Sequence, residues 1–214
     1  GYFEGIVEGD IRVITYGTEK MPDFILNKLK VNFPKIKLIQ TFGTTETGII
    51  PMKLSKNHDS IKFANENEFK IKDNVLFLRS NLDATYLNSK NNSFEDGWFN
   101  TGDLVKLNED GSITIIGRIK DIINVGGQKV TPQEIENIIG KIDGIDDVLC
   151  YPIPNPITSQ AVGIKIKIKN NSDFNKLKKL IKQEFSVHEK FKRPVLIEKV
   201  ENIYYSPRGK KIRI

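Results

Sequence analysis

The sequence predicts a mixed fold, with an α/β part followed by an α+β part. Three observations lead to this prediction. β-branched runs flank one helical pattern near the start, short strands joined by turns follow, and a mixture of strands and two helices fills the end. The length of 214 residues favours two units over one, because a typical domain has about 100–150 residues.

The first elements form a strand–helix–strand pattern. Residues 11–16 are a β-branched run that ends at Gly17, Pro22 opens a helical pattern, and residues 37–42 form a second strand that stops at Gly43. This order predicts a βαβ unit with parallel strands. Ligands collect at the C-terminal ends of such strands, so the loops after both glycines are candidate ligand-binding loops.

The middle of the chain changes to short strands. Residues 69–71, 75–78, 102–107 and 112–116 have the composition of strands, and residues 108–111 (Asn-Glu-Asp-Gly) form a predicted hairpin turn. We expect a small antiparallel β subdomain or partial barrel here.

The last part reads as a compact α+β domain that begins near residues 118–121. Gly126-Gly127 lies in a predicted hairpin, and Thr131 has the features of a helix N-cap, with Pro132 at the first helical position and Glu134 completing a capping box. The other predicted elements are strands at residues 146–152, 161–169 and 194–200 and a helix at 173–187.

Composition excludes several classes of protein. The chain is 38% hydrophobic and 28% charged, which is typical of globular domains. The net charge of +6 comes partly from lysines that alternate with isoleucines in residues 163–169, as on the solvated face of a strand. The alternative is that these lysines form a basic surface for a phosphorylated substrate. We expect no nucleic acid partner, because the net charge is the only feature that suggests one.

The cysteine count and the apolar runs bear on compartment. Cys150 is the single cysteine, it lies in an apolar run, and we expect a buried hydrophobe rather than a nucleophile. The lack of a disulfide fits a reducing, cytoplasmic compartment. No apolar run approaches the ~20 residues that a membrane span needs. The first residues do not form a signal peptide and lack an initiator Met, so we expect a fragment of a longer protein.

Four short motifs can carry chemistry, and each has a plainer interpretation. The loop Gly43-Thr44-Thr45-Glu46 offers hydroxyl groups to a phosphate and a carboxylate to Mg²⁺, or it is a polar loop with a helix-capping Thr. Asp103 in Thr101-Gly102-Asp103 can accept hydrogen bonds from two ribose hydroxyls, or it is a turn aspartate.

The other two motifs lie in the second part. Arg118 can reach a ribose or a phosphate, and Gly126-Gly127 allows a ligand close to the backbone or simply forms a type I′ turn. Residues 206–213 form a flexible basic loop in which Lys210 can neutralise an acyl-phosphate transition state, or they are a frayed tail.

The order and spacing of these motifs resemble the adenylate-forming superfamily of AMP-dependent ligases. That family includes acyl-CoA synthetases, beetle luciferases and peptide-synthetase adenylation domains. The similarity runs from about residue 11 to 213, through residues 42–46, 101–103, 117–136 and 209–210.

The resemblance implies a domain division and a reaction. Residues 1–118 would be the C-terminal part of a large adenylate-forming domain, and residues 119–214 a mobile C-terminal α+β domain. The family forms an acyl-adenylate from a carboxylic acid and ATP, then transfers the acyl group to a thiol. The family's phosphate loop lies in an upstream N-terminal portion, so we expect this chain alone to be inactive.

The resemblance also implies roles for individual residues. Thr45 and Glu46 would bind phosphate and Mg²⁺, Asp103 and Arg118 the ribose, and Phe42 the adenine. Lys210 would bridge the acid and ATP during adenylation, and Lys120 would be the hinge. The remaining implied contacts are Gly17, Thr18, Glu19, Gly43 and Thr44 with the nucleotide, and Gly126, Gly127 and Gln128 with coenzyme A.

The thiol acceptor and the acid stay open. Residues 124–132 look more like acyl-CoA synthetases than peptide-synthetase domains, which favours coenzyme A over a carrier-protein phosphopantetheine. A non-catalytic truncated interaction domain is a further alternative. Gly48 and Ile49 mark only the rim of the expected acid pocket.

Overall fold

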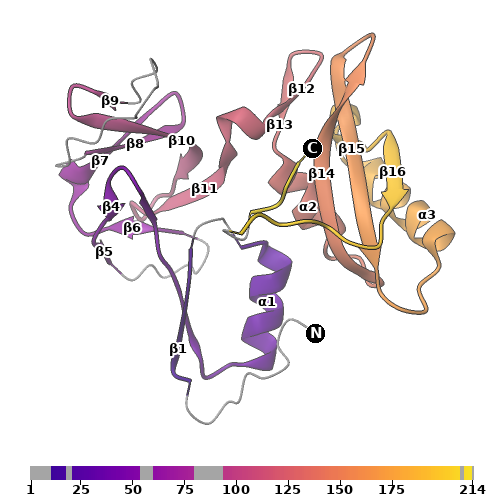
Figure 1. Ribbon diagram of the computed structural model, residues 1–214, viewed down its shortest axis with the longest axis horizontal. Coiled ribbons are helices and arrows are strands. Elements are labelled where there is room, and N and C mark those ends of the chain that lie inside the picture. The colour runs from indigo at the N-terminus through magenta and orange to yellow at the C-terminus, as the bar shows by residue number, and fades with distance from the viewer. Residues whose placement is uncertain (1–10, 18–20, 54–59, 80–93, 208–209, 214) are drawn as a thin grey trace. The chain divides into compact units, whose positions relative to one another are not determined.

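The computed structural model describes residues 11–17, 21–53, 60–79, 94–207 and 210–213 (Figure 1). The chain divides into two compact units, Gly1–Ile116 and Gly117–Ile214. The first contains a parallel strand pair and an antiparallel sheet, and the second packs two helices on a sheet. This architecture confirms the predicted α/β and α+β fold class. The division into residues 1–118 and 119–214 of a larger enzyme stays a prediction.

The first unit begins with the predicted βαβ unit. Strand β1 (Val13–Tyr16) and strand β2 (Lys37–Gln40) pair in parallel and are joined by helix α1 (Asp23–Asn32). The helix buries Leu26 and Leu29, three positions apart and so on one face, against the strands. The C-terminal ends of the two strands therefore lie side by side, as expected.

Two short hairpins lead from β2 to a larger sheet. The first hairpin pairs β3 (Gly43–Thr44) with β4 (Gly48–Ile49), and the second pairs β5 (Met52–Lys53) with β6 (Lys62–Phe63).

The larger sheet of the first unit confirms the predicted antiparallel subdomain. Its strands run in the order β11-β10-β8-β7, with β9 beside β10. Leu76, Leu78 and Val105 from these strands form a buried cluster. The predicted turn at residues 108–111 is confirmed, since Gly111 has φ +75° and donates to the Asn108 carbonyl at 3.0 Å. The elements are the 3₁₀ turn η1 (Glu66–Glu68) and strands β7 (Phe69–Lys72), β8 (Val75–Arg79), β9 (Phe94–Glu95), β10 (Trp98–Leu107) and β11 (Ile113–Arg118).

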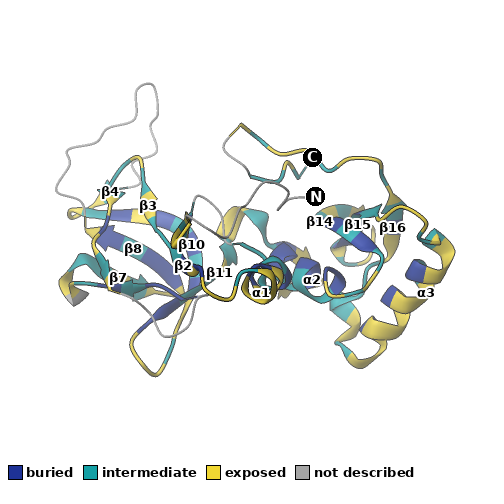
Figure 2. Ribbon diagram, turned by 90° about the horizontal axis from the view of Figure 1, so that it is seen from below, coloured by how far each residue is buried: buried dark blue, intermediate teal, exposed yellow. Residues whose placement is uncertain are grey.

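The second unit covers one face of its sheet with both helices. Helix α3 places Leu177 and Ile181 on one buried face, Phe185 directly after the helix joins them, and α2 adds Ile135 and Ile139 to the same core. Figure 2 shows buried positions along α3. The strands run in the order β13-β12-β15-β14, with β16 beside β15. The strands are β12 (Ile123–Val125), β13 (Gln128–Val130), β14 (Ile145–Asn155), β15 (Ser159–Ile168) and β16 (Leu196–Lys199). The helices are α2 (Pro132–Ile139) and α3 (Phe174–Glu184), with 3₁₀ turns η2 (Ile119–Asp121), η3 (Phe185–Val187) and η4 (Lys190–Lys192).

Two details of the predicted helices differ from the structure. The predicted helix at 173–187 ends at Glu184 and tightens into η3. Thr131 is the N-cap of α2, as expected, but its side chain makes no cap hydrogen bond. The prediction of a capping box is wrong, because the Glu134 side chain instead accepts a hydrogen bond from Lys192 Nζ at 2.6 Å. None of the helices among the described residues combines the length and apolar character that a membrane crossing requires.

Candidate functional site

The first predicted loop begins where β1 and β2 end. Thr41 donates two hydrogen bonds to the Tyr16 carbonyl, from its backbone N–H at 2.7 Å and from its hydroxyl at 3.2 Å. A Cβ added to Gly17 would lie only 2.6 Å from Thr41 Oγ1 and 3.0 Å from its carbonyl oxygen. Glycine at position 17 is therefore required by this close approach. The predicted contacts Thr18 and Glu19 lie outside the described residues.

Phe42 and Gly43 connect β2 to the first hairpin. The half-buried Phe42 ring lies edge-to-face against Phe63, with ring centroids 6.3 Å apart, and packs against the core of the antiparallel sheet. A Cβ on Gly43 would come within 2.7 Å of the Gly48 carbonyl oxygen. The ring contact fixes Phe42, and the close approach of the backbone leaves no room for a side chain at position 43.

The loop itself is a hairpin turn and does not open a helix, so the interpretation of a helix-capping Thr is wrong. The hydroxyl of Thr44 lies 2.9 Å from that of Thr47 and accepts the Thr47 backbone N–H at 3.1 Å. These bonds close the turn so that β3 can pair with β4. Thr45 at its tip is exposed and Glu46 is half-buried.

Asp103 lies in a β-bulge inside β10. The register pairs Asn100 with Phe77 and then Leu104 with Val75, so β10 holds two more residues than β8 across this step. Gly102 adopts φ +68°, a left-handed conformation that suits glycine. The interpretation of Asp103 as a turn aspartate is wrong, because β10 continues from Trp98 to Leu107 on both sides of it.

Side chains inside the bulge fix its shape. Thr101 Oγ1 donates to the Leu76 carbonyl at 2.8 Å and accepts the Asp103 backbone N–H at 3.0 Å. Asn100 Oδ1 accepts the Gly102 N–H at 2.9 Å. Asp103 is 5% exposed. The hydrogen bonds of the Thr-Gly-Asp motif thus fix the backbone around Asp103, whose side chain is almost buried.

The second unit carries the other predicted residues. Arg118 ends β11 and is half-buried, while Lys120 is exposed in η2. Gly126 and Gly127 have φ +58° and +88° and join β12 to β13, which confirms the predicted type I′ turn. Gln128, the next residue, is exposed.

Lys210 lies in a tail that is held in place. Its backbone carbonyl accepts the Ser206 N–H at 2.7 Å, and its own N–H donates to Ser206 Oγ at 3.1 Å. The next residue, Lys211, is bridged antiparallel to Tyr205. The interpretations of this segment as a flexible loop or a frayed tail are wrong for its described residues, because polar contacts fix both ends of it.

Residues that hold this tail were missed by sequence reasoning. Glu136 on α2 and Asp147 on β14 are buried and pair with Arg213 and Lys211. The available signal was an acidic residue inside each of two apolar patterns, together with two cations spaced by two residues near Lys210.

The structure groups the predicted residues only in part. Gly17, Phe42 and the Thr44–Glu46 turn follow the adjacent ends of β1 and β2, and Asp103 lies in the larger sheet of the same unit. Arg118, Lys120, the Gly126–Gln128 turn and Lys210 belong to the second unit.

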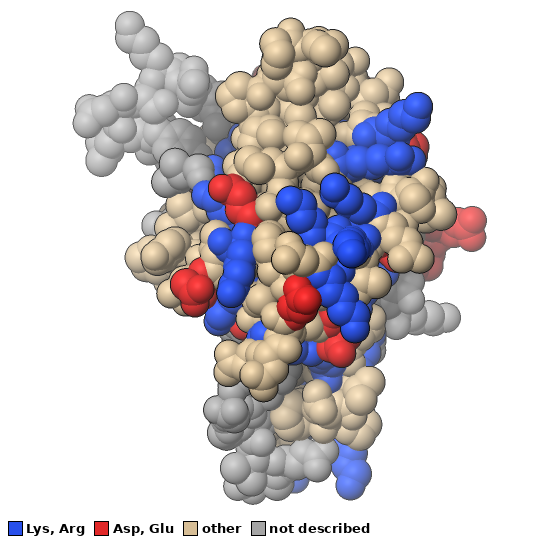
Figure 3. All heavy atoms as spheres, turned by 90° about the vertical axis from the view of Figure 1, so that its right-hand side faces the viewer, with Lys and Arg blue, Asp and Glu red and all other residues tan. Residues whose placement is uncertain are grey.

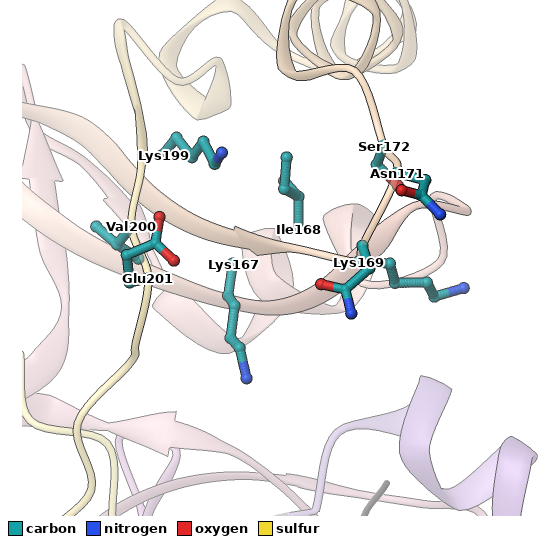
Figure 4. Close-up of a pocket in the computed structure, with 9 residues that line it drawn as sticks. Lys167, Ile168, Lys169, Asn171, Ser172, Lys199, Val200 and Glu201 are labelled. Carbon is teal, nitrogen blue, oxygen red and sulfur yellow. The ribbon is translucent and has the colours of Figure 1, made fainter.

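A hollow in the second unit involves none of the predicted residues. It is lined by Lys167, Lys169, Lys199 and Glu201 among others. Figure 4 shows that the ends of the three lysine side chains do not converge, and Lys167 and Lys169 already pair with Asp146 and Asp143. It therefore lacks the convergent cations of an anion site. Within the described part of the chain, no group of three or more His, Cys, Asp or Glu is placed to hold a metal ion.

The basic charge of the chain belongs to the second unit. Residues 117–214 contain 19 Lys and Arg against 11 Asp and Glu, a net charge of +8, whereas residues 1–116 have a net charge of −2. Figure 3 shows many Lys and Arg side chains on the side of the molecule where α3 lies. In β15, Ile164 and Ile166 are buried while Lys165 and Lys167 are half-exposed. The alternation in residues 163–169 is thus a buried face and a solvated face, as predicted.

Known proteins were compared with the chain by sequence. No protein-family model matches it. It is 30% identical over 148 residues to an acyl-CoA synthetase, ALT10, of Alternaria alternata, covering 65% of this chain and 26% of that protein. It is 28% identical over 214 residues to the 2-succinylbenzoate–CoA ligase of Staphylococcus aureus strain Newman, covering 93% of this chain and 42% of that protein. The chain thus spans less than half the length of these relatives.

Solved structures share the fold. The o-succinylbenzoate CoA synthetase of Bacillus subtilis, in complex with its acyl-adenylate, aligns with a TM-score of 0.78 at 20% identity, covering 96% of this chain and 46% of that one. The anthranilate CoA ligase AuaEII, in complex with anthranoyl-AMP, aligns with a TM-score of 0.78 at 22% identity, covering 94% and 42%. Together with the sequence relatives, the shared fold supports the adenylate-forming superfamily, and this chain matches a C-terminal part of its members.

Proposed function

We propose that this chain is the C-terminal part of an ATP-dependent ligase that activates a carboxylic acid and joins it to the thiol of coenzyme A. Relatives along 93% of the chain are named CoA ligases, and two proteins of the same fold were solved with acyl-adenylates. In the first step a carboxylate oxygen of the acid attacks the α-phosphorus of ATP, and pyrophosphate leaves. In the second, the thiol sulfur attacks the acyl carbonyl and loses its proton, and AMP leaves.

The observation that carries the proposal is the bulge at Asp103. The sheet gives up regular pairing there and uses Thr101 and Gly102 to hold a single carboxylate. Bulges that re-aim one side chain are typical of ligand sites. A carboxylate accepts hydrogen bonds from two vicinal hydroxyls at once, so we assign Asp103 to the ribose of ATP, with Arg118 assisting.

The loops at the ends of β1 and β2 supply the rest of the nucleotide site in this proposal. Phe42 would pack against adenine, and its edge-to-face contact with Phe63 fixes the plane of its ring. The segment Gly17–Glu19 would follow the base. Gly43 and Thr44 shape the turn that brings the exposed Thr45 hydroxyl to a phosphate.

Glu46 would share Mg²⁺ with the phosphates of ATP. Glu46 is half-buried and directly follows the exposed Thr45 in the turn, and carboxylate and hydroxyl oxygens are ligands that fit Mg²⁺. Since Mg²⁺ commonly binds one or two carboxylates together with substrate phosphates and water, phosphate and water oxygens would complete its coordination. The ion would neutralise charge on the departing pyrophosphate.

The second unit would act in both steps. Lys210 would bridge the acid carboxylate and ATP during adenylation, placing a positive charge where negative charge develops. The turn Gly126–Gln128 would receive the pantetheine arm, and Lys120 would be the pivot between the two arrangements. Both cosubstrates are cytoplasmic metabolites, which is our basis for proposing that compartment.

Pyrophosphate exchange tests this proposal. The protein that contains this chain together with its N-terminal portion should exchange pyrophosphate into ATP when given a cognate acid, with 2-succinylbenzoate and anthranilate as first probes. Asp103→Asn should slow exchange by about ten- to a hundredfold, since hydrogen bonds to a charged group contribute about 1.5–3 kcal/mol. Comparable exchange by the 214-residue chain alone would contradict the assignment as a part. Coenzyme A and a phosphopantetheine-loaded carrier protein, offered in parallel, identify the acceptor.

A further inference from the structure

We propose that Glu136 and Asp147 are positioning residues for Lys210, because they bind the cations that follow it and so hold the described residues 204–207 and 210–213 beside strand β14. Asp147 lies outside the motifs that carry the resemblance to a family, and Glu136 ends one of those motifs without a role assigned to it. The inference rests on the proposed function in one respect, which is that Lys210 acts in adenylation.

The two carboxylates lie inside the second unit. Glu136 is 1% exposed and Asp147 is 4% exposed. A charged carboxylate at such a depth destabilises the fold unless it is paired and hydrogen-bonded. Both therefore need cations, and no neighbour in the chain sequence of either residue supplies one.

The C-terminal segment supplies them. Arg213 Nη2 lies 3.0 Å from Glu136 Oε1 and 3.2 Å from Oε2. Lys211 Nζ lies 3.0 Å from Asp147 Oδ1 and 3.5 Å from Glu136 Oε2. The Lys211 and Arg213 side chains are only 6% and 13% exposed. Two buried negative charges thus pair with two buried positive charges that lie at least 64 residues later in the sequence.

The same groups satisfy the open edge of β14. Strand β14 ends the sheet order, so within the described part of the chain its outer backbone groups have no partner strand. Glu136 Oε1 accepts the Cys150 N–H at 2.9 Å, and Asp147 Oδ1 accepts the Val148 N–H at 2.8 Å. Lys211 Nζ donates to the Val148 carbonyl. The network therefore supplies the hydrogen-bond partners that a neighbouring strand would otherwise provide at this sheet edge.

The upstream half of the segment is fixed to the same place. The Tyr205 hydroxyl donates to Asp147 Oδ2 at 2.6 Å. Tyr205 is bridged to Lys211, and the Ile212 N–H donates to the Tyr204 carbonyl at 3.0 Å. Anchors thus stand on both sides of position 210.

The spacing of the anchors determines the side on which Lys210 projects. Lys211 and Arg213 are two residues apart and both reach the buried carboxylates. Successive side chains of an extended segment point to opposite sides. Lys210 and Ile212 therefore belong to the other side, and Ile212 is indeed 37% exposed. Glu136 and Asp147 thereby hold the Lys210 backbone while its side chain projects away from the network.

Amide hydrogen exchange on the 214-residue chain tests the anchor without any activity. In the wild type, the backbone amides of residues 204–206 and 210–213 should be protected. Glu136→Gln and Asp147→Asn keep side-chain shape but remove the charge, and each should speed exchange in this segment by about tenfold or more through local opening. Exchange in β15, which lies in the core, should stay slow. Asp143→Asn is the matched control, because Asp143 also pairs with a lysine but is 97% exposed.

Each outcome of that experiment bears on the anchor. Segment exchange as fast in the wild type as in an unstructured peptide, or unchanged in both variants, would overturn it. If Glu136→Gln loosens the whole unit, the combined Glu136→Gln, Arg213→Gln variant leaves no unpaired charge at this site. It should then restore protection in β15 and leave the amides of residues 204–206 and 210–213 fast, whereas protection of both would overturn the anchor.

A double-mutant cycle in the longer protein tests the link to Lys210. Glu136→Gln should lower the adenylation rate with little change in the KM for ATP. In a Lys210→Ala background, Glu136→Gln should have no further effect, because both changes remove the same contribution. If the rate losses of the two single variants multiply in the double variant, Glu136 acts independently of Lys210, through stability alone. That result would overturn the positioning role. Absence of adenylation in the wild type would instead refute the proposed function and leave the exchange result standing.

Discussion

The hydroxyl of Thr101 joins two strands by donating to the Leu76 carbonyl at 2.8 Å while it accepts the Asp103 N–H at 3.0 Å. One side chain thus bonds the neighbouring strand and closes the bulge. It also explains why a threonine at this position is 8% exposed, since its polar group is satisfied twice.

Replacing Thr101 with valine should destabilise the first unit by about 1–3 kcal/mol, because two buried backbone groups lose their partner. Thr101→Ser is the matched control and should cost less, since it keeps the hydroxyl. Urea unfolding followed by fluorescence checks this directly, because Trp98 is the single tryptophan and lies in β10. Equal midpoints for the valine and serine variants would show that the hydroxyl contributes nothing.

Gly102 gives a second test of the same bulge. Its φ is +68°, and a Cβ added to it would meet no atom within 4 Å, so only backbone strain opposes a side chain. We expect Gly102→Ala to cost about 1–2 kcal/mol. Gly102→Asn should cost less, because asparagine tolerates the left-handed region better. The same fluorescence assay ranks the variants, and an alanine variant as stable as the wild type would contradict the strain.

The sequence predicted the parts of the fold that rest on local patterns. The parallel pairing of β1 and β2 followed from one βαβ pattern, and the type I′ turn at Gly126 followed from two adjacent glycines. Helix α3 was placed by its buried stripe, although its end was set too late.

Local patterns could not predict the features that depend on distant partners. The bulge at Asp103 is closed by a bond to Leu76, 25 residues away. The tail is held by Glu136, which pairs with Arg213 across 77 residues. Residues 206–213 therefore looked like a flexible basic loop, because the carboxylates that neutralise them lie in other elements.

Cys150 should be unreactive in the folded protein. It is fully buried, and burial raises the pKa of its thiol well above its usual range, with the negative charge of Glu136 adding to the shift. Since the thiolate is the reactive form, a disulfide thiol reagent at mildly alkaline pH should modify the chain only after urea unfolds it. Cys150 is the single cysteine, so the signal needs no assignment. Rapid stoichiometric modification of the native chain would contradict the burial.

Tyr151 should make the second unit sensitive to alkali. Burial raises the pKa of its phenol well above the usual value, and the hydrogen bond it donates to the Glu198 carboxylate raises it further. A group whose pKa is raised by folding stabilises the fold below its unfolded pKa, about 10 for tyrosine, and this stabilisation is lost as pH rises above that value.

A phenolate absorbance titration of the wild type against Tyr151→Phe checks this. The difference between the two curves isolates Tyr151. It should show no ionisation near pH 10, which is about the pKa of free tyrosine. Ionisation of Tyr151 together with the exposed tyrosines would contradict the predicted shift. Stability, measured by urea unfolding, should fall less steeply with rising pH in the phenylalanine variant.

The turn at Gly126 can separate a structural role from a role in thiol transfer. Its φ of +58° suits asparagine, and a Cβ there would meet Thr158 Cγ2 at an ordinary 3.4 Å. Gly126→Asn should therefore change stability by no more than about 0.5 kcal/mol, as for type I′ turns with Asn-Gly. Gly126→Val should cost about 1–2 kcal/mol or more, because a β-branched residue resists positive φ.

The asparagine variant then tests the proposed contact with coenzyme A in the longer protein. If the pantetheine arm passes close to the Gly126 backbone, the added side chain should slow thioester formation from acyl-adenylate while leaving pyrophosphate exchange unchanged. Hydrogen exchange in β12 and β13 serves as the control, because both strands should stay protected. If the asparagine variant keeps wild-type rates in both half-reactions, the pantetheine arm does not approach Gly126. The glycines would then have only a conformational role in the turn.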